Sequence, residues 1–145
     1  MTPDWWWFAK EDLGMARELL EGGHHPEGVT FHCQQAVEKM LKGALRDAGQ
    51  IPPRIHDLMK LLDLCEPAVP GSAGLRDVCH ALNKYYVPAR YPDAFAGSGP
   101  EGLPILEDAR KAVEAAAHAW DFFEARRRPQ VKERRVAYRA GRRRR

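Results

Sequence analysis

Apolar residues recur at alternating three- and four-residue steps along most of the first 125 residues. This spacing places them on one face of an α-helix, which has 3.6 residues per turn. The longest uninterrupted example is the segment 104–125, with Leu106, Ala109, Val113, Ala116, Trp120 and Phe123. No segment combines the two-residue alternation of a strand with a hairpin turn. The pattern therefore predicts an all-α fold.

Prolines and glycines divide this pattern into five helices. Thr2 is placed to cap the first helix, and Gly22-Gly23 ends it. The others are predicted over about 26–48, 57–65, 72–86 and 104–125. Together they predict an up-and-down bundle of four longer helices plus one short connecting helix.

Charge separates the chain into two parts. Residues 126–145 contain eleven Lys or Arg and one acidic residue, a local charge of +10, whereas residues 1–125 carry 12 basic and 19 acidic residues, a charge of −7. We therefore expect a helical bundle over 1–125 and a basic, flexible C-terminal tail over 126–145. Arg126-Arg127-Arg128-Pro129 is expected to end the last helix.

The three cysteines, Cys33, Cys65 and Cys79, lie on or beside apolar stripes, which favours buried, reduced thiols over disulfides or a zinc site. His32 and Cys33 are neighbours on a helix and point in different directions, so a shared metal is not expected. No apolar run has the length of a membrane span, and the N-terminus lacks the pattern of a secretion signal. We expect a cytoplasmic protein with no cofactor and no metal.

The segment 82–93 contains the most distinctive candidate site. Two prolines restrict the backbone around Arg90, whose guanidinium is suited to phosphate or carboxylate. With Lys84, Tyr86 and Tyr91 it can form a site for an anion and a stacked base. Asp93 is a further candidate ligand-binding residue. Alternatively, the tyrosines pack in the core and Arg90 pairs with Asp93 or an internal carboxylate to brace the loop.

His56-Asp57 allows two interpretations as well. The imidazole can transfer protons with the carboxylate orienting it, or Asp57 caps the third helix and His56 only lies in the turn. Capping is the favoured interpretation, and His56 remains a candidate ligand-binding residue.

Three motifs in this order resemble the HEPN domain, a small helical domain of prokaryotic nucleotide-binding and ribonuclease-related systems. They are FHCQQAVEKMLK at 31–42, His56-Asp57-Leu58, and YYVPARYPD at 85–93, and the resemblance covers about residues 5 to 125. It implies a homodimeric helical bundle, often encoded beside a minimal nucleotidyltransferase, with some such pairs acting as toxin and antitoxin.

HEPN ribonucleases carry an arginine, four to six further residues and then a histidine. The nearest pairs here are Arg110 and His118 with seven residues between them, Arg76 and His80 with three, and Arg17 and His24 with six. The last pair has the right spacing, but it crosses the Gly-Gly stop of the first helix. No pair inherits the motif, and we expect no catalytic residue.

Two further surfaces predict partners. The consecutive residues Trp5, Trp6 and Trp7 cannot all face one core, so at least one is exposed or covered by a second chain. The second helix also offers a polar face for a dimer or partner interface, formed by Gln34, Gln35 and Glu38. In the tail, Arg126, Arg127 and Arg128, and Arg142, Arg143, Arg144 and Arg145, can attract phosphate polymers, contact the acidic bundle, or form a passive extension.

The sequence therefore predicts a homodimeric interaction module that binds a nucleotide or a nucleotidyltransferase partner, in a toxin–antitoxin-type system. The alternatives are a metal-independent ribonuclease with a non-standard site and an RNA-binding protein that uses its arginine-rich tail.

Overall fold

A computed structural model describes residues 4–86 and 97–143, with the backbone alone for Glu101 and residues 128–143. In this part of the chain the secondary structure is helical throughout, which confirms the all-α prediction. The elements are α1 (Trp5–Gly22), α2 (Pro26–Asp47), α3 (Leu58–Cys65), η1 (Ser72–Leu75), α4 (Arg76–Asn83), η3 (Pro100–Gly102) and α5 (Leu106–Arg143).

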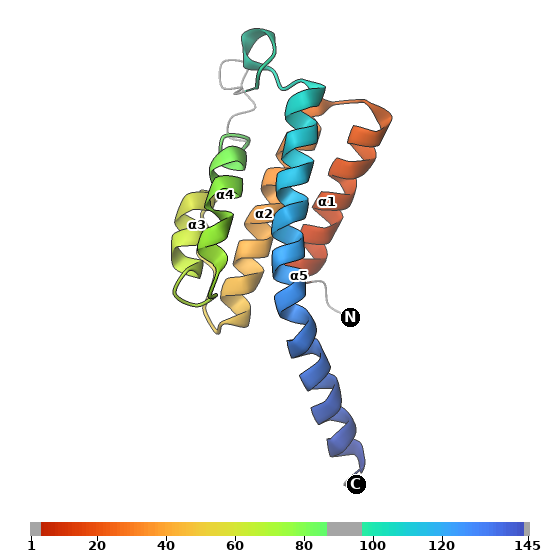
Figure 1. Cartoon of the computed structure of the whole chain (residues 1–145), viewed down its shortest axis with the longest axis vertical. Coiled ribbons are helices and arrows are strands. Elements are labelled where there is room, and N and C mark those ends of the chain that lie inside the picture. The colour runs from red at the N-terminus through yellow and green to blue at the C-terminus, as the bar shows by residue number, and fades with distance from the viewer. Residues whose placement is uncertain (1–3, 87–96, 144–145) are drawn as a thin grey trace.

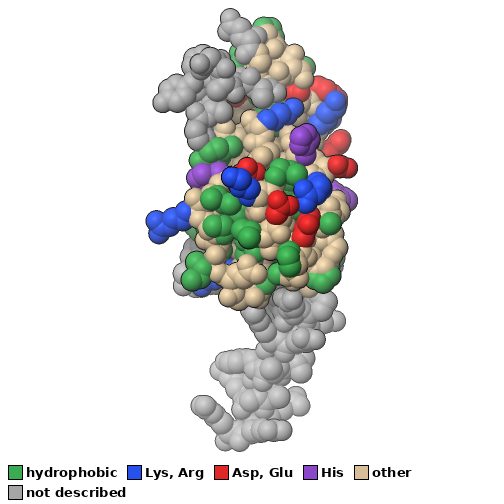
Figure 2. Space-filling view, turned by 90° about the vertical axis from the view of Figure 1, so that its left-hand side faces the viewer, with side chains coloured by type: hydrophobic (Ala, Val, Ile, Leu, Met, Phe, Trp, Pro, Cys, Tyr) green, Lys and Arg blue, Asp and Glu red, His purple; other side chains and the backbone are tan. Residues whose placement is uncertain are grey.

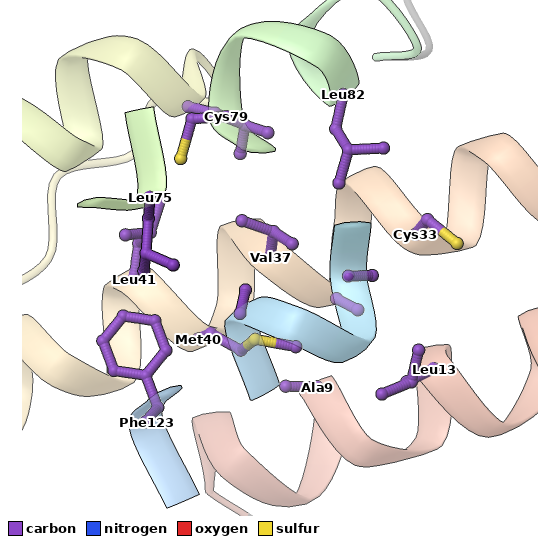
Figure 3. Packing of buried hydrophobic residues seen from close by; sticks show 14 of the residues in the cluster. Ala9, Leu13, Cys33, Val37, Met40, Leu41, Leu75, Cys79, Leu82 and Phe123 are labelled. Carbon is purple, nitrogen blue, oxygen red and sulfur yellow. The ribbon is translucent and has the colours of Figure 1, made fainter. Parts of the chain in front are cut away.

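Helix α2 lies at the centre of the bundle. It packs against α1, α3, α4 and α5, and α5 also contacts α1 and α4. Figure 1 shows α1, α2 and α5 running side by side, with the shorter α3 and α4 on one flank. Val37, Met40 and Leu41 of α2 are fully buried and lie between side chains of the neighbouring helices (Figure 3).

Local capping residues fix both ends of α1. Gly23 adopts a positive φ of 69° after α1, and its N–H together with that of His24 closes the last turn on Leu20 and Leu19. The predicted stop at Gly22-Gly23 is therefore confirmed. Asp4 rather than Thr2 caps α1, because its carboxylate accepts a hydrogen bond from the Trp7 N–H at 2.8 Å.

Two predicted helix ranges differ from the structure. The fourth segment begins as the 3₁₀-helix η1 and continues as an α4 of eight residues ending at Asn83. Helix α5 does not end at Ala125, and its backbone remains helical to Arg143. That expected end is wrong, since Arg, Lys, Gln and Ala on both sides of Pro129 favour helix strongly enough to continue past it.

No helix in the described part of the chain carries an apolar stretch long enough to span a bilayer. The three cysteines are buried and free, as the sequence predicts. Burial raises the pKa of Cys33, Cys65 and Cys79 to about 12 in each case.

Candidate functional site

A buried carboxylate on α2 forms the base of the candidate site. The Glu38 side chain is only 5% exposed, and each of its oxygens has a partner. Oε2 accepts a hydrogen bond from Lys42 Nζ at 3.2 Å, one turn further along α2, and Oε1 lies 2.9 Å from His56 Nδ1. A buried carboxylate needs such partners, because the loss of its hydration otherwise costs several kcal/mol.

The His56 imidazole connects this carboxylate to the surface. Its side chain is 46% exposed, and its ring stacks on that of Tyr86, with centroids 4.3 Å apart and 16° between the planes. We call Glu38, Lys42, His56 and Tyr86 the His56 site. One of the imidazole nitrogens faces Glu38, so Nε2 is the nitrogen left to exchange a proton or to bind a ligand.

Hydrogen bonds to the backbone hold His56 in place. Gln34 Nε2 donates to the His56 carbonyl at 3.1 Å, and Gln35 Nε2 donates to Gln34 Oε1 at 2.7 Å. Asp57 caps α3 by accepting from the N–H groups of Met59 and Lys60, which confirms the predicted cap. The loop before α3 is therefore fastened to α2 on one side and to α3 on the other.

Asn83 connects α4 to the same corner. Its Oδ1 accepts from the Leu58 N–H at 2.8 Å, and its Nδ2 donates to Asp57 Oδ1 at 3.1 Å. Because Asn83 is the last residue of α4, this contact fixes where Lys84, Tyr85 and Tyr86 leave the helix. The position of Tyr86 against His56 thus depends on three helices.

A second group of hydrogen bonds, centred on Asp108, involves residues that follow 87–96 in the sequence. The Asp108 carboxylate accepts hydrogen bonds from the N–H and hydroxyl of Ser98 and from the Ile105 N–H. Burial alone would raise the pKa of Asp108, but these hydrogen bonds, helped by the charge of Lys84, lower it. The carboxylate therefore stays ionised and fixes the segment that returns the chain to α5.

The structure brings together two of the predicted ligand-binding residues, His56 and Tyr86. Lys84 is exposed two residues before Tyr86, and its Nζ lies 5.2 Å from the centroid of the Tyr85 ring. Arg90, Tyr91 and Asp93 lie outside the described residues. On the molecular face toward α3 and α4, charged and histidine side chains lie among hydrophobic ones (Figure 2).

Glu38 and Gln34 lie in different surroundings from those that the sequence predicts. Both were expected on an outward polar face, but both are buried and bind His56. The reason is that the loop after α2 folds back and covers them. Their spacing contains a usable signal, since Gln34, Glu38 and Lys42 form a polar line at four-residue steps beside the buried apolar positions Cys33, Val37 and Leu41.

The arginines of the three Arg–His pairs considered for the ribonuclease motif either form ion pairs with carboxylates or are exposed. Arg76 forms ion pairs with Asp63 and Glu66 of the α3 region, and Arg110 pairs with Glu107 on α5. Arg17 is exposed on α1, and His24 follows the glycine that caps that helix. His80 and His118 are exposed on α4 and α5.

A separate recess lies where α5 leaves the bundle. Its volume is about 120 Å³, and it is lined by Trp6, Phe123, Asp47, Arg126 and Arg127 together with small apolar residues of α2 and the α3 to η1 connection. The Trp6 indole donates to Asp47 Oδ2 at 3.0 Å, while the Arg127 guanidinium covers the indole at 4.1 Å from the ring centroid. Within the described residues, no three His, Cys, Asp or Glu side chains are grouped to hold a metal ion.

Comparison with known proteins agrees with this architecture. The family model of the HEPN domain matches residues 2–126. The protein named "Putative toxin MJ1304" of Methanocaldococcus jannaschii is 29% identical over 127 residues, which cover 79% of this chain and 80% of that protein.

Two crystal structures are similar as well. One is TT1696 from Thermus thermophilus, with 31% identity, a TM-score of 0.70, and coverage of 83% of this chain and 94% of that one. The other is ST0689, an archaeal HEPN homologue, with 30% identity, a TM-score of 0.65, and coverage of 84% and 93%. The chain therefore belongs to the HEPN domain family.

Proposed function

We propose that this HEPN protein is a homodimeric interaction module of a toxin–antitoxin-type system, and that its His56 site binds a nucleotide or a nucleotidyltransferase partner. The relative named as a toxin supports the type of system. The geometry of the His56 ring supports the proposed ligand site, because the ring is oriented by the buried Glu38 and stacked on Tyr86. A cytoplasmic location is part of this proposal.

The chemistry of the site suits a nucleotide in two respects. A nucleobase can extend the stack of His56 and Tyr86, and base stacking on such rings contributes about 1–3 kcal/mol per base. The exposed Lys84 supplies a positive charge for phosphate two residues before Tyr86. Arg90 would add a second cation, as the sequence predicts.

Nucleotide binding is tested by titrating the dimer with ATP and with a nucleoside control, using calorimetry. His56→Ala and Tyr86→Ala should each weaken ATP binding by about tenfold or more, the effect of losing roughly 1.4 kcal/mol or more. His80→Ala is the matched control, since it removes an exposed imidazole on α4 outside the site. Equal affinity in wild type and His56→Ala would exclude the site.

The partner is tested separately by co-purification with a minimal nucleotidyltransferase encoded beside the gene. Charge reversal by Lys84→Glu and removal of the stack by Tyr86→Ala should reduce the recovered complex, whereas His80→Ala should not. A complex that all three variants retain would place the partner surface elsewhere on the molecule.

The homodimer is proposed through the exposed apolar side of α1. Trp7, Phe8 and Met15 are 46%, 44% and 40% exposed, and the Trp7 and Phe8 rings pack edge to face. Exposed aromatic groups of this size are typical interface anchors. Trp7→Ser combined with Phe8→Ser should convert the dimer to a monomer in sedimentation, while Ile51→Ser, which changes an apolar residue 94% exposed in a loop, should not.

A metal-independent ribonuclease is the second candidate, because Glu38 and His56 form a carboxylate and imidazole pair capable of proton transfer. In this reaction the imidazole would take the proton of a ribose 2′-hydroxyl, and the 2′-oxygen would attack the adjacent phosphorus. The 5′-oxygen would leave with a proton taken from water. Labelled RNA should then be cleaved to 2′,3′-cyclic phosphate ends by wild type and not by His56→Ala or Arg90→Ala. Binding without cleavage would leave the interaction module.

A further inference from the structure

The last part of α5 lies beyond the domain that the family model covers. The HEPN match ends at residue 126, whereas the α5 backbone continues as a helix to Arg143. Figure 1 shows this end of α5 extending away from the other four helices. We call residues 127–143 the α5 extension. The packing of the HEPN bundle does not account for this additional length of α5.

Basic residues follow a helical period along this extension. Arg128, Lys132, Arg135, Arg139 and Arg142 are separated by steps of four, three, four and three residues. At about 100° per residue, these positions fall within about 80° of one another around the helix. We call them the basic stripe. From Arg128 to Arg142 it is about 21 Å long at a rise of 1.5 Å per residue.

The basic stripe lies on the side of α5 opposite the core. Ala116, Ala119 and Phe123 are buried against the bundle, and their positions lie about 150° around the helix from the stripe. The single acidic residue of the segment, Glu133, is also displaced from the stripe, by about 140°. Five of the eight Lys and Arg residues of the extension therefore share one face, whereas Arg143, Arg127 and Arg134 lie about 60°, 100° and 120° from its centre.

Contacts with the bundle fix the point where the extension begins. The Arg127 guanidinium lies over the Trp6 ring, whose N–H binds Asp47, and the Arg126 guanidinium lies 5.4 Å from the centroid of the Phe122 ring. Burial lowers the pKa of Arg127, and the charge of Asp47 opposes this shift. These two arginines thus hold the start of the extension instead of belonging to the stripe.

We infer that the α5 extension is a helical arm that binds the phosphate backbone of duplex nucleic acid through the basic stripe. About 21 Å of duplex carries roughly twelve phosphates, more than enough to meet every stripe residue. Four of the five stripe residues are arginines, whose planar guanidinium binds phosphate through two parallel hydrogen bonds.

A membrane surface fits the extension less well. Membrane-surface helices place a continuous apolar face opposite their basic one. Here the large apolar residues are Val131, Val136 and Tyr138, and their positions spread over about 160° of the helix. The chemistry shared by RNA and DNA duplexes is the partner that the stripe matches, and this inference goes beyond the proposed nucleotide site.

The test uses the full chain and labelled 20-base-pair RNA and DNA duplexes in fluorescence anisotropy at increasing salt. Five or six phosphate contacts predict a log–log salt slope of about −5, or a loss of affinity of roughly a thousandfold between 50 and 200 mM salt. The two duplexes distinguish the two sources of the same phosphate chemistry. His56→Ala should bind both as wild type does, which separates this arm from the nucleotide site.

A charge-swap variant tests the stripe against composition alone. It combines Arg128→Gln with Gln130→Arg, Arg135→Ala with Ala137→Arg, and Arg139→Ala with Ala140→Arg. Net charge, composition and helix propensity are unchanged, but three of the five stripe charges move to other faces. We expect at least a tenfold weaker duplex affinity and a shallower salt slope, with unchanged helicity by circular dichroism.

Three results would overturn the inference. The first is equal duplex affinity of the charge-swap variant and wild type, since charge alone would then account for binding. The second is the absence of duplex binding at 50 mM salt. The third is salt-sensitive association of the protein with itself, or with vesicles of anionic phospholipid, that is stronger than its binding to either duplex.

Discussion

The imidazole of His56 lies nearly parallel to the phenol ring of Tyr86, with 4.3 Å between the ring centroids. Residue 56 precedes α3 and residue 86 follows α4, so this stack joins two loops at one end of the bundle. The buried Glu38 carboxylate lies 2.9 Å from His56 Nδ1 and orients the imidazole against Tyr86.

Replacing one residue of the buried Glu38 and Lys42 pair should destabilise the protein much more than replacing both. Glu38→Ala leaves the Lys42 ammonium buried and unpaired, and we expect a loss of about 3–5 kcal/mol in the free energy of unfolding. Replacing both residues, by Glu38→Leu and Lys42→Met, should restore most of that loss. Urea denaturation measures both values, and a double variant less stable than Glu38→Ala would contradict this account.

Gly43 permits a close approach of α1 to α2. A Cβ atom at this position would lie 2.8 Å from Trp6 Cε2, in a ring that is itself buried and hydrogen-bonded to Asp47. Gly43→Ala should therefore destabilise the fold by about 1–3 kcal/mol, despite the better helix propensity of alanine.

Gly14→Ala is the control for this prediction. Gly14 is also inside a helix, but a Cβ there meets nothing within 4 Å. It should increase the thermal stability slightly, by roughly 0.5–1 kcal/mol at most. If both variants change stability in the same direction, Trp6 does not control the spacing of α1 and α2.

The three thiols should be unreactive in the folded protein. Burial raises the pKa of each to about 12, so almost no thiolate is present at pH 8. A thiol reagent should label none of them at pH 8 and all three in denaturant. Rapid labelling of Cys33, Cys65 or Cys79 in native buffer would contradict the observed packing.

The raised pKa values of the same thiols predict that the folded protein becomes less stable at alkaline pH. Their pKa is higher in the folded state than the ordinary 9.0, so their contribution is fully present below pH 9 and declines as the pH rises toward 12. The free energy of unfolding should fall across this range, and Cys79→Ala should make the fall less steep. An identical slope in this variant would show that other groups cause it.

The sequence predicted the elements that local chemistry decides. Asp57 as a cap and Gly23 as a stop follow from side-chain and backbone preferences within four residues. The continuation of α5 past Pro129 was missed because one breaker was given more weight than the helix formers around it. The burial of Glu38 was missed because the four-residue spacing of Gln34, Glu38 and Lys42 marks a polar line but does not show that the loop after α2 folds back over it.

The most direct test of the His56 site is to follow the histidine ring signals by NMR while the protein is titrated with ATP. We expect a saturable shift of the His56 ring protons, with the exposed His80 and His118 signals unchanged. Loss of the effect in Tyr86→Ala would agree with a ligand stacked on this pair. ATP binding that leaves His56 unshifted, or the absence of any binding, would show that His56 and Tyr86 do not form a nucleotide site.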